Sequence, residues 1–61
     1  MRAYVAFRDA NNIVRIDGLF DPLPARGTII CGWEIREYDS VVMDSNPPQM
    51  SGTVVAAETF A

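Results

Sequence analysis

The sequence predicts an all-β fold of about five short strands, arranged as a small barrel or sandwich with little or no helix. Apolar and polar residues alternate with a period of two along Thr28–Glu37, as a half-buried strand requires. In addition, no segment carries a sustained helical pattern with start and stop signals. With 61 residues the chain has room for one domain, which we place at residues 1–61.

The first two expected strands form a hairpin. Ala3–Phe7 and Ile13–Ile16 are rich in strand-forming residues, and the segment between them, Arg8–Asn12, contains Asp and Asn, which tolerate the left-handed turn conformation. The next segment, Asp17–Gly27, contains two prolines, which lack the N–H group that a central strand must donate. We therefore expect a long and fairly rigid loop there.

The second half of the chain is expected to supply three more strands. Thr28–Glu37 is read as one strand that buries Ile29, Cys31, Trp33 and Ile35 on one face. A shorter strand is expected at Ser40–Met43, followed by a proline-containing loop. The last strand is expected from Thr53 to about Ala57. On this pattern the thiol of Cys31 is buried and unreactive.

The charge of the chain argues against several classes of partner. The net charge is −3, and the five basic residues, all arginine, are scattered along the sequence. Nucleic acids and anionic membranes reward clustered positive charge, so we expect neither as a partner. No apolar run reaches the length of a membrane span and the N-terminus does not resemble a signal peptide, so we expect a cytoplasmic location.

The sequence offers little material for catalysis. It has no histidine and a single cysteine, so the usual nucleophile–base pairs and the soft metal-ligand sets cannot be assembled. Asp9 and Asn11 have the spacing of the first calcium-loop ligands, but Ile13 stands where a third oxygen ligand is needed. We interpret them as turn residues. No catalytic, cofactor-binding or metal-binding residue is predicted, and no small-molecule substrate is expected.

The expected strands leave a second apolar surface. A chain this short buries only about 60% of its unfolded surface and cannot cover both faces of its own sheet. Either the sheet closes into a small barrel with a few exposed apolar side chains, or another chain covers the second face. The residues that this pattern assigns to a protein interface are Tyr4, Ile13, Ile30, Tyr38, Val54 and Val55.

Three segments resemble a known family. Leu23–Ile30, the pair Tyr38-Asp39 and Gly52–Ala56 are similar to segments of the small capsid decoration (cement) proteins of tailed bacteriophages. In that family a proline-preceded glycine opens a strand, a Tyr-Asp pair ends the middle of the domain and a glycine-led apolar strand follows. The resemblance covers about half of the chain, which differs by the insertion of Arg26, by a shorter length and by the lack of a long N-terminal arm. It implies a virion location and a capsid partner.

These observations leave three functions to compare. The leading hypothesis is a non-enzymatic structural or assembly module that packs on itself, as a homo-oligomer, or on a larger assembly such as a capsid. The alternative is a small acidic binding protein that inhibits or regulates a host protein through Asp39, Asp44 and the surrounding loop. A minimal enzyme that uses carboxylates is the third, and no spacing of the acidic residues specifies such a site.

Overall fold

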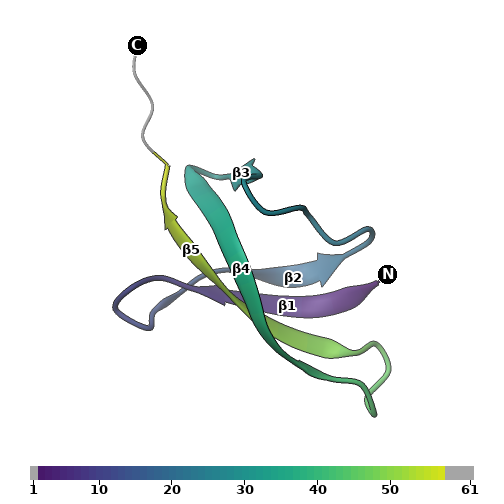
Figure 1. Ribbon diagram of the computed structural model, residues 1–61. Helices are drawn as coiled ribbons and strands as arrows, with labels where there is room; N and C mark the ends of the chain where they lie inside the picture. Colours follow the sequence, from purple (N-terminus) through teal and green to yellow (C-terminus); the bar gives the residue numbers. More distant parts are fainter. Residues whose placement is uncertain (1, 58–61) are drawn as a thin grey trace.

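The structure is a computed structural model, and it describes residues 2–57. These residues form one five-stranded sheet in the order β2-β1-β5-β4-β3, curled into a half-barrel (Figure 1). No helix occurs in this part of the chain, so the predicted all-β class with five strands is confirmed. The strands are β1 (Ala3–Arg8), β2 (Val14–Phe20), β3 (Ile29–Ile30), β4 (Trp33–Val42) and β5 (Gln49–Ala56).

The strand β1 lies inside the sheet and has two different kinds of neighbour. It pairs antiparallel with β2 through the predicted hairpin and parallel with β5, which is more than forty residues later in the sequence. β5 also pairs antiparallel with β4. The first and last strands are therefore neighbours, and the two hairpins, β1–β2 and β4–β5, join along them (Figure 1).

One face of the sheet, called here the inner face, holds the core. Its buried residues are Ala3, Val5 and Phe7 of β1, Ile35 of β4 and Val54 of β5. The β1 side chains alternate between buried and more exposed because successive residues of a strand point to opposite faces. Leu23, from the segment between β2 and β3, packs against this core as well. We call the opposite side of the sheet the outer face.

Phe7 is the centre of the aromatic packing. Its ring lies 5.8 Å from that of Phe20 in an edge-to-face arrangement and 5.6 Å from that of Tyr38. Such pairs add to the stabilisation that comes from burying apolar surface. The predicted inward orientation of Phe7 is confirmed. Tyr38, which the sequence pattern placed at an interface, is instead half-buried against the core.

The expected loop at Asp17–Gly27 is wrong in its first part. β2 continues to Phe20, because Asp17, Gly18, Leu19 and Phe20 each pair with a residue of β1. The prolines do not interrupt this pairing, since both follow the end of the strand. Backbone pairing with β1 therefore keeps β2 in strand conformation beyond the residues that the sequence pattern assigned to it.

The expected single strand at Thr28–Glu37 is also wrong. Cys31 and Gly32 have φ values of 52° and 82° and form a two-residue turn between β3 and β4, in which Ile30 pairs with Trp33. Two successive positive φ values are the signature of the tight turn that joins antiparallel strands. The thiol of Cys31 is exposed at this turn, not buried.

The turn also changes which isoleucine faces the core. Ile30 packs against the core and Ile29 is 54% exposed, the reverse of the predicted orientations. Trp33 and Ile35 keep their predicted inward positions. The expected separate strand at Ser40–Met43 is the second half of β4, which runs without interruption through two bulges to Val42.

The hydroxyl group of Tyr38 ties the segment between β2 and β3 to the sheet. It donates a hydrogen bond of 2.5 Å to the carbonyl oxygen of Pro24. We expect Tyr38→Phe to lower the free energy of unfolding by about 1 kcal/mol, because the ring is kept while the Pro24 carbonyl loses its donor. Urea denaturation measures this change. Tyr4→Phe is the matched control, since Tyr4 is 45% exposed, and an equal loss in both variants would contradict the prediction.

Burial also makes Tyr38 sensitive to alkaline pH. Burial raises the pKa of the Tyr38 phenol above its ordinary value, so the folded protein favours the neutral form. Its contribution to stability is fully present below the pKa of the unfolded chain and is lost as the pH rises through the raised folded pKa. We expect the melting temperature to fall more steeply above the ordinary tyrosine range in the wild type than in Tyr38→Phe. Parallel curves for the two proteins would contradict this.

Candidate functional site

The predicted interface residues separate into two groups. Tyr4 is 45%, Ile13 49% and Val55 40% exposed, so these three are accessible to a partner. The others contribute to the core: Val54 is buried, whereas Ile30 and Tyr38 are half-buried against it. Val54 and Val55 are successive residues of β5 and therefore point to opposite faces of the sheet.

Among residues 2–57, more large apolar side chains are exposed than fully buried. The fully buried ones are Val5, Phe7, Ile35 and Val54, whereas nine large apolar residues are at least 40% exposed. Isolated exposed residues are normal in monomers, but contiguous groups indicate binding surfaces. The nine are Tyr4, Ile13, Val14, Leu19, Ile29, Val41, Val42, Met43 and Val55.

Three of these residues are consecutive and form what we call the hairpin tip. Val41, Val42 and Met43 are 45%, 53% and 62% exposed, at the end of β4 where it turns towards β5. Val41 and Val42 belong to opposite faces of the strand, so the tip is apolar on both faces. Figure 1 shows this tip at one end of the sheet, away from the C-terminal end of β5. The interface residues assigned from the sequence do not include this tip, because Ser40–Met43 was expected to be a short separate strand.

A second apolar feature lies at the other end of β5. A hollow of about 290 Å³, called here the β5 groove, is bounded by the β1–β2 loop on one side and by the last residues of β5 on the other. Arg15 and Trp33 complete it, with the Arg15 guanidinium 5.1 Å from the centre of the Trp33 ring. The lining residues are Asp9, Ala10, Asn11, Arg15, Trp33, Val54, Val55 and Ala56.

Asp9 holds the β1–β2 loop in shape. Its Oδ1 atom accepts hydrogen bonds from the backbone N–H groups of Asn11 at 2.9 Å and Ile13 at 3.0 Å. Its Oδ2 atom accepts a hydrogen bond of 2.6 Å from Nε of Arg15. The carboxylate is therefore used by the turn itself, as the sequence interpretation of Asp9 and Asn11 predicted.

The same contacts set the response of the loop to acid. The hydrogen bond from Arg15 holds the pKa of Asp9 below its ordinary value, and those from Ile13 and Asn11 act in the same direction. The ionised carboxylate therefore contributes to stability above the unfolded pKa, and this contribution is lost as the pH falls through the lowered folded pKa.

We therefore expect the amide NMR signals of Asn11 and Ile13 to shift together as the pH falls below the ordinary aspartate range. Asp9→Asn keeps an oxygen acceptor but has no charge to titrate, so its amide signals are expected to stay constant over that range. The same acid-induced shifts in Asp9→Asn would contradict the role given to Asp9.

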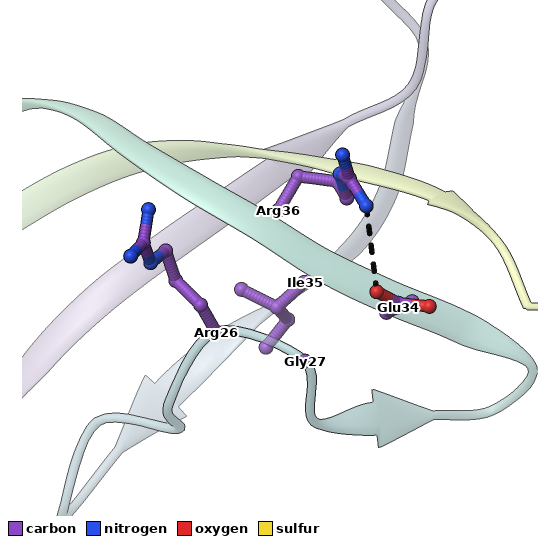
Figure 2. A pocket seen from close by; sticks show the side chains of 5 residues that line it. All are labelled: Arg26, Gly27, Glu34, Ile35 and Arg36. Carbon is purple, nitrogen blue, oxygen red and sulfur yellow. Dashed lines mark ion pairs between the residues drawn. The ribbon is translucent and has the colours of Figure 1, made fainter.

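A second hollow, also of about 290 Å³, is more polar than the β5 groove. Arg26, Gly27, Glu34, Ile35 and Arg36 line it, and Arg36 forms an ion pair of 3.6 Å with Glu34 (Figure 2). Figure 2 shows Arg26 extending away from this pair, so the two guanidinium groups do not converge on one point. The Arg36 side chain is 60% exposed, and such solvent-exposed pairs contribute little to stability. This hollow lacks the arrangement that would hold a specific anion.

Among residues 2–57, no three His, Cys, Asp or Glu side chains lie close enough together to hold a metal ion. In the same part of the chain no helix has the length and apolar character needed to cross a membrane. Searches against protein-family models, curated proteins and solved structures found no match to this chain.

Proposed function

We propose that this protein is a non-enzymatic assembly module that works by docking its exposed apolar surfaces onto other protein surfaces. The observation that carries the proposal is that, among residues 2–57, nine large apolar residues are exposed and four are fully buried. Burying apolar surface stabilises by about 25 cal/mol per Å² removed from water, so these side chains favour association. The hairpin tip and the β5 groove are the two places where apolar residues gather.

Sedimentation velocity over a wide range of protein concentration tests this proposal. We expect a weight-average sedimentation coefficient that rises with concentration, because association by apolar surfaces follows mass action. A chain that stays monomeric throughout and also fails to join any larger particle would rule out an assembly role.

The more specific proposal is that the assembly is the virion of a tailed phage, in which this chain is a capsid decoration protein. The support is the resemblance of Leu23–Ile30, Tyr38-Asp39 and Gly52–Ala56 to that family. Co-sedimentation with phage capsids that lack their own decoration protein is the direct test. Saturable binding supports the virion role, and its absence in a chain that still self-associates leaves only the coarser proposal.

A second candidate function is regulation of a basic host protein. Asp39 and Asp44 are both exposed and flank the hairpin tip, so an apolar contact there is bordered by negative charge. Complementary charge increases association rates and selects partners. If this function is correct, affinity capture from a host extract is expected to recover one basic protein. The double variant Asp39→Asn, Asp44→Asn is expected not to bind that protein. Unchanged capture by the double variant would remove this candidate.

A further inference from the structure

The first relevant feature is a free strand edge beside the β5 groove. The parallel pairing of β1 with β5 ends at the pair Arg8 and Thr53, but β5 continues to Ala56. On its other side β5 remains paired with β4 as far as Ala56. Within the described residues, no strand pairs with Val54–Ala56 on the β1 side, so alternate backbone N–H and C=O groups face the groove.

The walls of this groove are preformed and electrically balanced. Asp9 accepts three hydrogen bonds that fix the loop on one side, and its ion pair neutralises Arg15. Trp33, Val54, Val55 and Ala56 contribute apolar surface. A preformed, neutral, apolar groove with a free strand edge fits an uncharged extended segment, which can add to the edge as a further strand.

The hairpin tip is such a segment. Beyond Ile35, which bonds to Gly27 and Thr28, no other part of the described chain pairs with the outer edge of β4. Val41 and Val42 are the last two residues of β4, past both of its bulges, and Met43 begins the turn that follows. All three are uncharged, and the tip is apolar on both faces. The tip therefore has a free backbone edge and apolar side chains. These two features match the free edge and the apolar wall of the β5 groove.

The remaining free edges are protected against pairing. The outer edge of β4 between Arg36 and Asp39 carries two bulges and three charged residues. The two edge strands of the sheet are β2, which has a bulge at Arg15 and a charge at Asp17, and β3, which is only two residues long. Bulges and charges on edge strands prevent them from pairing with other chains. The tip and the β5 groove each combine a free strand edge with apolar side chains, and neither carries a bulge.

We propose that the hairpin tip of one copy of this chain docks in the β5 groove of a second copy, adding Val41–Met43 to the free edge of Val54–Ala56. This rests on the proposed assembly function and names its partner. The tip and the groove lie at opposite ends of β5, which spans about 23 Å at the usual rise per residue. A contact between two different surfaces repeats from copy to copy, so it builds a ring or a filament rather than a closed pair.

Two single substitutions separate the two halves of this contact. Val42→Glu places a charge on the tip, and Val55→Glu places one on the groove; both side chains are exposed, so the fold is kept. Ala10→Glu, on the opposite wall, is a second groove variant. Leu19→Glu is the matched control, because Leu19 is 52% exposed and lies in neither surface.

Sedimentation velocity of single and mixed proteins gives the test. We expect wild type and Leu19→Glu to self-associate, and each tip or groove variant alone to be monomeric. An equimolar mixture of Val42→Glu and Val55→Glu is expected to form a dimer and nothing larger, since one copy supplies an intact tip and the other an intact groove. The only tryptophan, Trp33, lines the groove, so its fluorescence should change on mixing.

The outcomes distinguish this inference from the assembly proposal itself. If wild type associates while the mixture stays monomeric, the tip-to-groove contact is wrong and another surface carries the assembly. If Val42→Glu or both groove variants associate as wild type does, the contact is wrong as well. A wild type that is monomeric at every concentration also overturns the contact, and binding to capsids then decides the assembly role separately.

Discussion

Phe7→Ala is expected to unfold much of the protein at room temperature. Phe7 is completely buried and its ring contacts both Phe20 and Tyr38, so its removal leaves a cavity in the centre of the inner face. Truncation of a buried phenylalanine costs about 3–5 kcal/mol. A domain of this size has a total stability of about 3–9 kcal/mol at usual values per residue, so the loss is comparable to the whole.

Urea denaturation followed by circular dichroism measures this effect. Leu19→Ala is the control, because Leu19 lies on the outer face of β2 and is 52% exposed. We expect that variant to differ from wild type by less than about 0.5 kcal/mol. A Phe7→Ala protein with a midpoint close to that of wild type would show that Phe7 is not the centre of the core.

Gly52→Ala is expected to have the second-largest effect, by adding atoms rather than removing them. A Cβ at position 52 would lie 2.8 Å from the backbone oxygen of Glu37 and 2.8 Å from two ring carbons of Phe7. The backbone of β4 cannot move away without breaking its pairing with β5. We expect a loss of about 1–3 kcal/mol, as for other overpacked sites.

A double-mutant cycle identifies the source of this strain. Phe7→Leu combined with Gly52→Ala removes the ring contact but leaves the contact with the oxygen of Glu37, so we expect only partial recovery relative to the two single variants. Thr53→Ala, at the next position of the same strand, is the control and is expected to cost much less. Additive single effects would show that Phe7 and position 52 do not interact.

The tight turn at Cys31 and Gly32 explains why the strongest sequence pattern was misread. The two residues that flank a two-residue turn pair directly and lie on the same face of the sheet, so the alternation shifts by one residue across the turn, and Ile30 rather than Ile29 shares the face of Trp33. The sequence of Thr28–Glu37 keeps its period of two and does not report this shift. Ile29 and Ile30 then exchange faces relative to the prediction. The glycine was the available signal, but its role depends on Cys31 also adopting a positive φ, which is uncommon for a residue with a side chain.

Individual residues of the candidate site could be predicted from the sequence, but their arrangement around the β5 groove could not. The exposure of Tyr4, Ile13 and Val55 followed from strand alternation, and Asp9 was read correctly as a turn residue. The β5 groove was not predicted, because it joins the β1–β2 loop to the end of a strand more than forty residues later. No local pattern reports such a pairing.

The sequence by itself determined the all-β class and the β1–β2 hairpin, because strand propensity and turn residues act over a few residues. The tertiary structure decided the parallel pairing of β1 with β5, the extension of β2 to Phe20 and the unequal lengths of β1 and β5. Those features depend on contacts between distant segments. The free edge at Val54–Ala56, on which the proposed self-assembly rests, exists because β1 stops at Arg8 while β5 continues.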